Sequence, residues 1–274
     1  MTDIIDYLNS LDNDITKIDI SYKNLTELPD LSRFKNLLIL ICSNNQLTFL
    51  PFLNDNLEYL NCDNNQLTFL PPLNDKLEYL SCDDNNLTSL PTLNNNLKKI
   101  WCSHNLLISL PPLNDKLYTL NCKYNKLTSL PPLNDNLKYL YCSNNQLTSL
   151  PKINNNLCLL ECQDNNLISL PIFNYNYNYN NLWIWILNCN NNPICEIIGN
   201  ITINDIDKII KWNYFREFYF LLKLRKKIIS WMWKSREAKI RQLFHPSHLT
   251  DFLKNNNVFE NDDVSLDMFL DNWN

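Results

Sequence analysis

Cysteine is the residue whose spacing most invites a chemical explanation in this chain. Seven of the ten cysteines recur every 20 residues, at Cys42, Cys62, Cys82, Cys102, Cys122, Cys142 and Cys162. A metal site needs several ligands converging on one point, and a disulfide needs two side chains turned toward each other. Thiols that repeat once per structural unit all point the same way. We therefore interpret them as small buried apolar residues and expect no metal site and no cofactor.

Catalytic chemistry has few candidates. His104 and Cys158 are the base and nucleophile candidates on the expected surface, but three repeats separate them, roughly 14 Å at ~4.8 Å per strand. A catalytic dyad needs a separation of about 3 Å. Asp83 and Asp84 are adjacent, yet no pocket or further metal ligand is evident beside them. Helix capping suffices to explain the H-x-x-H at residues 245–248. We expect a protein that is not an enzyme.

Composition narrows the function further. The 274 residues include a single glycine, Gly199. Phosphate-binding loops and nucleophile elbows require glycine, so the composition argues against a nucleotide-binding or hydrolase fold. The N-terminus is acidic and lacks the apolar run of a signal peptide, and the most apolar windows are too short or too charged to cross a bilayer. We expect a cytoplasmic protein with reduced thiols.

The cysteines belong to a longer repeat, L-x-x-L-x-C-x-x-N-x-L-x-x-L-P. Its fourth and sixth positions are two residues apart, so both point inward from one short strand. Successive strands then stack in parallel. The proline that follows makes the return path extended or a single tight turn rather than a full helix. The repeated asparagine, for example Asn85 or Asn105, is expected to bond backbone groups of the adjacent turn.

This pattern resembles the leucine-rich repeats, most closely the 20-residue subtype of bacterial effector proteins, in which "LPxLPxxLxxLxxxxNxLxxL" recurs. Here "LND" or "LNN" fills the place of the second proline. The resemblance implies an α/β repeat fold. It is a leucine-rich-repeat solenoid with a parallel β-sheet on its concave face, extended or short-turn segments on its convex side and a C-terminal helical region.

Irregular segments bracket the regular block. Residues 15–198 hold nine repeats, of which the first has Ile20 in the cysteine position and continues through a longer step, residues 30–40, with room for a short helix. We expect residues 1–14 to form an N-terminal helical cap, because Ile4, Ile5, Leu8 and Leu11 fall on one helical face and a solenoid end must be covered. We expect residues 199–274 to form a C-terminal helical region with an acidic tail.

The outward strand positions are the place for function, and they are not uniform. Two acidic repeats give way to repeats rich in lysine, tryptophan and tyrosine. Exposed aromatic and positively charged residues characterise protein-binding hot spots, although cross-strand aromatic pairs can also simply stabilise a sheet. The residues that we predict to bind a partner are Tyr79, Lys99, Trp101, Tyr118, Tyr124, Tyr139 and Tyr141.

The C-terminal region has a different character. Residues 201–243 carry eleven Lys/Arg against four Asp/Glu with helical apolar spacing. Such a basic helix could contact a membrane, a calmodulin-like groove or nucleic acid. We favour the alternative that it caps the solenoid while its basic face meets the acidic tail. The stretch "WMWKSREAKIRQLFHPSHL" resembles tails on repeat proteins of giant DNA viruses (mimivirus-like), which would imply a viral protein and a host–virus interaction.

Together these features predict a non-enzymatic, intracellular leucine-rich-repeat module that binds another protein on its concave face, with no small-molecule substrate. The alternative is an adaptor whose repeats select a target while the basic C-terminal helix docks on a membrane or larger assembly.

Overall fold

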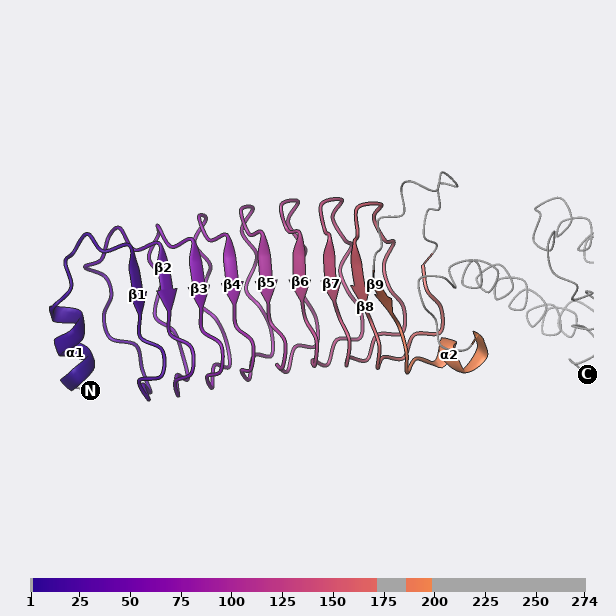
Figure 1. Cartoon of the computed structure of the whole chain (residues 1–274), viewed down its shortest axis with the longest axis horizontal. Helices are drawn as coiled ribbons and strands as arrows, with labels where there is room; N and C mark the ends of the chain where they lie inside the picture. The colour runs from indigo at the N-terminus through magenta and orange to yellow at the C-terminus, as the bar shows by residue number, and fades with distance from the viewer. Residues whose placement is uncertain (1, 172–185, 199–274) are drawn as a thin grey trace, which may run out of the picture. The chain divides into compact units, whose positions relative to one another are not determined.

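The computed structural model describes residues 2–171 and 186–198. It contains one nine-stranded sheet in which every neighbouring pair is parallel and the strands follow the order of the sequence (Figure 1). The predicted parallel-strand solenoid is confirmed. The strands are β1 Lys17–Asp19, β2 Ile39–Ile41, β3 Tyr59–Asn61, β4 Tyr79–Ser81, β5 Lys99–Trp101, β6 Thr119–Asn121, β7 Tyr139–Tyr141, β8 Leu159–Glu161 and β9 Ile186–Asn188, and the helices are α1 Thr2–Asn9 and α2 Pro193–Ile198.

The pairing register follows the period of the repeat. From Leu40 to Leu160 the central strand residues pair at intervals of 20 residues, and the central residue of each of these strands is buried. The first interval is 22 residues, because Ile18 pairs with Leu40, and the last is 27, because Leu160 pairs with Leu187. A strand slipped by one residue would expose the whole leucine set, so burial fixes the register.

The cysteine column lies inside the solenoid, as predicted. Cys62, Cys82 and Cys102 have no exposed surface, and the thiol of Cys82 donates to the Trp101 carbonyl of the next repeat at 3.3 Å. Burial raises the pKa of the thiols, that of Cys122 to about 12. These cysteines are therefore packed, protonated donors without nucleophilic character.

The predicted asparagine ladder is confirmed. The Asn105 Oδ1 accepts the N–H of Leu87 at 2.9 Å, and its Nδ2 donates to carbonyls of its own and the preceding repeat, including Cys82 at 2.9 Å. Each such side chain joins two turns, so an otherwise unpaired buried backbone donor is satisfied.

A second asparagine ladder runs along the opposite edge of the solenoid, which the sequence did not lead us to expect. The Nδ2 of Asn94 donates to the Asn74 carbonyl at 2.6 Å, and that of Asn114 donates to the Asn94 carbonyl at 2.8 Å. The Asn114 Oδ1 accepts the N–H of Lys116 at 2.8 Å. The "LND" and "LNN" segments therefore cap the turn before each strand and tie it to the preceding turn.

The turn after each strand of the regular block has a residue in the left-handed conformation, and none of these residues is glycine. The second residue after each cysteine of the regular block has φ between 52° and 56°. Asparagine and aspartate tolerate this conformation best among non-glycine residues, and they occupy most of the column. His104 and Tyr124 are the exceptions.

The N-terminal end is covered by α1, which lies beside β1 in Figure 1. Ile4 and Leu8 are buried, whereas Ile5 is 47% exposed, so the apolar face is narrower than the sequence indicated. The guanidinium of Arg33 donates to the Leu8 carbonyl.

The longer step after β1 had room for a short helix, but this described segment contains none. Two consecutive turns stand in its place, closed by Phe34 N–H to the Leu31 carbonyl and Leu37 N–H to the Phe34 carbonyl, each at 3.1 Å. Phe34 is fully buried and fills the core at this point. The proposed basic helix and acidic tail at residues 199–274 lie outside the described residues.

Candidate binding surface

The outward side chains of β4 to β7 form an aromatic and cationic surface on the concave face. Lys99 is at its centre. Its Nζ lies 5.7 Å from the ring centroid of Tyr79, 5.5 Å from that of Trp101 and 5.3 Å from that of Tyr118. An ammonium within about 6 Å of an aromatic face is attracted to it. We call these four residues, which come from three adjacent repeats, the Lys99 cluster.

A second lysine extends this surface toward β8. The Nζ of Lys123 lies 4.9 Å from the ring centroid of Tyr141 and pairs with the carboxylate of Glu161. Lys123 and Glu161 were not among the predicted site residues, although both occupy outward positions of their repeats. The 20-residue strand register could have identified them, because it places the repeats of Lys123 and Glu161 on either side of the β7 repeat, which carries Tyr139 and Tyr141.

Tyr124 stands apart at the edge of the sheet. Its ring stacks on the imidazole of His104 with centroids 4.1 Å apart and planes at 15°. Both residues have φ of 52°, an uncommon conformation for tyrosine. Tyr139 lies on β7 between Thr119 and Leu159 and is 37% exposed. The structure thus brings four of the seven predicted residues into one cluster, whereas Tyr124, which follows β6, and Tyr139 and Tyr141, on β7, all lie on one side of it.

Carboxylates dominate the outward positions of the β3 and β4 repeats, on one side of Lys99. Burial raises the pKa of Asp83 to about 6, and the nearby Asp63 and Asp84 charges add to this effect. The N–H of Ser103, which donates to Asp83 at 2.6 Å, acts in the opposite direction. Burial likewise raises the pKa of Asp63 despite hydrogen bonds from Ser81. Neither Asp63 nor Asp83 takes part in the ion pairs found in the part of the chain that the structure describes.

The catalytic candidates remain apart. His104 follows β5 and Cys158 precedes β8, so β6 and β7 separate them. The Cys158 thiol donates to the Asn156 carbonyl at 3.4 Å. Across residues 2–171 and 186–198 there is no group of three or more histidine, cysteine or acidic side chains placed to hold a metal ion.

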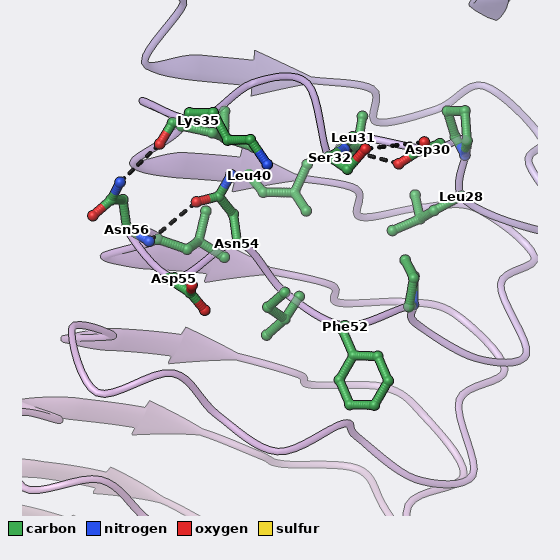
Figure 2. A pocket seen from close by; sticks show the side chains of 15 residues that line it. Leu28, Asp30, Leu31, Ser32, Lys35, Leu40, Phe52, Asn54, Asp55 and Asn56 are labelled. Atoms are coloured by element: carbon green, nitrogen blue, oxygen red, sulfur yellow. Dashed lines mark hydrogen bonds between the residues drawn. The ribbon is translucent and has the colours of Figure 1, made fainter.

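A cavity of about 520 Å³ opens on the return side of the first repeats (Figure 2). It arises where the 22-residue first interval departs from the regular one. Leu28, Leu31 and Leu53 line it, and Phe52, which is 87% exposed, stands at its edge. Asp30, Lys35 and Asp55 supply charges of both signs, so the cavity has no clear preference for one class of ligand.

The described helices include none that is long and apolar enough to cross a bilayer. No protein-family model and no curated protein sequence matches the chain. Solved structures do. YopM from Yersinia pestis is 35% identical over 57% of this chain and 45% of its own, with a TM-score of 0.54. A Shigella effector leucine-rich-repeat domain is 33% identical over 56% of this chain and 70% of its own, with a TM-score of 0.52.

The chain belongs to the leucine-rich-repeat family. A leucine-rich-repeat protein from Leptospira interrogans is also similar, at 28% identity over 58% of this chain and 51% of its own, with a TM-score of 0.50. This leucine-rich-repeat protein spans less than half the length of YopM. The resemblance of its repeats to those of bacterial effectors is confirmed, whereas the resemblance of its tail to proteins of giant DNA viruses finds no support among these neighbours.

Proposed function

We propose that this leucine-rich-repeat protein is a non-enzymatic module that binds another protein on its concave face. The residues proposed to contact the partner are the Lys99 cluster with Tyr124, Tyr139 and Tyr141. The observation that carries the proposal is the grouping of three aromatic rings around one ammonium on a solvent-facing sheet surface. Aromatic residues with a neighbouring positive charge supply much of the binding energy of protein interfaces.

Sheet stabilisation accounts for only part of this grouping. The Tyr59 and Tyr79 rings lie 6.2 Å apart across β3 and β4, as a cross-strand pair would. Trp101, however, has Ser81 and Asn121 as its register partners, so no aromatic ring stands directly beside it in its column. Small polar residues suffice for this column in the neighbouring repeats, which favours a partner for Trp101.

The interaction is proposed to take place in a cytoplasm, where reducing conditions keep the buried thiols of the cysteine column intact. The resemblance of the tail to giant-virus proteins would make that cell the host and the partner a host protein. The alternative function, an adaptor docked through the basic C-terminal helix, depends on residues outside the described ones.

The test uses substitutions that the repeat itself supplies. Trp101→Asn and Tyr141→Asn place on β5 and β7 the residue found at Asn61, Asn121 and Asn188 of the same column, so folding should be retained. A matched control removes two exposed apolar residues elsewhere, through Phe69→Ser and Ile108→Thr, for which later repeats again provide the precedent.

Tagged full-length protein and both double variants are used to capture partners from eukaryotic cell lysate. A partner bound by the wild type and the control, but weakened at least about 30-fold by the Trp101/Tyr141 change, supports the proposal. If all three proteins capture the same partner equally well, the concave aromatic residues are sheet stabilisers and the proposal is wrong.

A further inference from the structure

Charge is segregated along the concave face, strand by strand. The outward positions of the β3 and β4 repeats carry five acidic residues and no basic one, namely Glu58, Asp63, Glu78, Asp83 and Asp84. The corresponding positions of the β5, β6 and β7 repeats carry four lysines and no acidic residue, namely Lys98, Lys99, Lys123 and Lys138. The β8 repeat is acidic again, with Glu161 and Asp164. A basic window three strands wide therefore lies between two acidic borders.

The pairing of the lysines divides them into two kinds. Lys98 pairs with Glu78 at 2.7 Å, and Lys123 pairs with Glu161. The charge of each of these two lysines is therefore neutralised by a carboxylate of the adjacent acidic border. Lys99 and Lys138 take part in no ion pair with a described residue. Lys99 is half-exposed among its aromatic neighbours, and Lys138 is exposed. The middle of the window thus holds two uncompensated positive charges.

We infer that the partner presents a short acidic segment to this window, with carboxylates at Lys99 and Lys138 and apolar side chains on the rings of Trp101 and Tyr118. The inference rests on the proposed function and adds the chemistry of the partner. β5 and β7 are two strand spacings apart, about 10 Å. Carboxylates separated by about three extended residues span that distance.

The acidic borders favour a short protein segment over a nucleic acid. Four strand spacings, about 19 Å, separate β4 from β8. A polyphosphate chain bound along the sheet would run past both borders and meet the carboxylates of Asp83 and Glu161. A peptide can confine its negative charge to the window and place neutral or basic residues opposite the borders. Such complementarity affects association rate and partner selection more than bulk affinity.

The two lysines can be neutralised without introducing residues foreign to their positions. Lys99→Thr copies Thr119, and Lys138→Tyr copies Tyr118, each from the same column one repeat away. The control is Lys126→Gln with Lys152→Thr. It removes two positive charges from exposed positions outside the window, where Gln146 and Thr92 provide the precedent. Both double variants therefore have the same net charge.

The probes are a fluorescein-labelled decaglutamate peptide, a decalysine peptide of the same design and an oligothymidylate of ten nucleotides. Each is titrated by fluorescence anisotropy with full-length protein at low and at near-physiological ionic strength. We expect decaglutamate to bind most tightly, with an affinity that falls as salt screens the charges. The Lys99/Lys138 variant should bind it at least ten-fold more weakly, and the Lys126/Lys152 control should match the wild type.

Three results would overturn the inference. These are undetectable decaglutamate binding at low salt, equal weakening in both double variants, or tighter binding of decalysine or oligothymidylate. The capture of partners from lysate distinguishes failure of this inference from failure of the proposed function. A partner lost with Trp101→Asn/Tyr141→Asn, but bound equally by the Lys99/Lys138 variant, would leave the concave face as the binding surface and show that the partner segment there is not acidic.

Discussion

Asp83 offers a direct test of the electrostatics beside the Lys99 cluster. Its carboxylate is half-buried, accepts the Ser103 N–H at 2.6 Å and has Asp63 and Asp84 as neighbouring charges. Burial raises its pKa to about 6, from an ordinary 3.8. Asp83→Asn keeps the shape and an acceptor oxygen for Ser103 while removing the charge, and Asn190 already occupies this column in the last repeat. We expect the variant to be more stable than the wild type at neutral pH.

The magnitude and the sign follow from proton linkage. A difference of about two pKa units corresponds to about 3 kcal/mol at ~1.4 kcal/mol per unit. Since solvent reaches part of the carboxyl, we reduce this to about 1 kcal/mol. Between pH 4 and pH 6 the folded Asp83 binds more protons than the unfolded one, so the wild type loses stability as the pH rises through that window. The advantage of Asp83→Asn should therefore be largest above pH 7 and absent near pH 4.

The assay is urea-induced unfolding followed by circular dichroism at pH 8, 6 and 4, with Asp84→Asn as the control. Asp84 is exposed and shares its column with Asn44, Asn64 and Asn144, so its substitution should change stability by less than about half a kcal/mol. An Asp83→Asn variant that is less stable than the wild type at pH 8 would refute the reasoning. That result would mean that hydrogen bonds to the carboxylate outweigh the effect of its burial. A stability difference that does not depend on pH would also refute the reasoning, because the pKa of Asp83 would then be the same in the folded and unfolded states.

Three further expectations concern the scaffold. Leu80→Ala should lower the free energy of unfolding by about 2–5 kcal/mol because its side chain is fully buried. Lys99→Thr, which loses only partly exposed cation–π contacts, should cost no more than about 1 kcal/mol; equal losses by urea unfolding would mean that the inward and outward faces have been exchanged. Asn114→Ala should cost about 1–3 kcal/mol because the Lys116 N–H loses its acceptor, and Asn95→Asp, at an exposed turn position where other repeats have aspartate, should be neutral in the same assay. Iodoacetamide should alkylate the half-exposed Cys158 and Cys195 of the native protein first, with the buried cysteine column reacting only after denaturation, as peptide mass spectrometry can establish; early modification of Cys102 would contradict the packed, protonated column.

The inward half of the solenoid was predictable from the sequence because its chemistry repeats. Leu60 and Cys62 are two residues apart and both fully buried, as alternation along a strand requires. Asn105 bonds the adjacent turn, as a buried amide with a fixed period must. Each inference drew on seven copies of the same local pattern, so a single irregular residue could not mislead it.

The features missed by the sequence reasoning arise between repeats. The "LND" asparagines looked like replacements for a proline, because only the folded chain shows that Asn114 reaches the carbonyl of Asn94, 20 residues earlier. The longer segment after β1 has room for a short helix, yet the structure has two turns there, with Phe34 buried in the core. The contact of Lys123 with Tyr141 and Glu161 depends on side chains from three repeats, and no single repeat carries that information.

The two asparagine ladders also explain why the concave face is free to specialise. Asn105 and its equivalents hold the turn after each strand, and Asn114 and its equivalents hold the turn before it. Between these turns the inward leucine or isoleucine and the cysteine are buried in every regular repeat. The outward residue of the β3 to β7 repeats changes from asparagine to serine, tryptophan, asparagine and tyrosine while the register stays the same. Cross-strand contacts such as Lys98–Glu78 account for part of the division of charge along the sheet, but Lys99 and Lys138, which form no ion pair with a described residue, need another explanation. A bound partner is the explanation that the proposed function supplies.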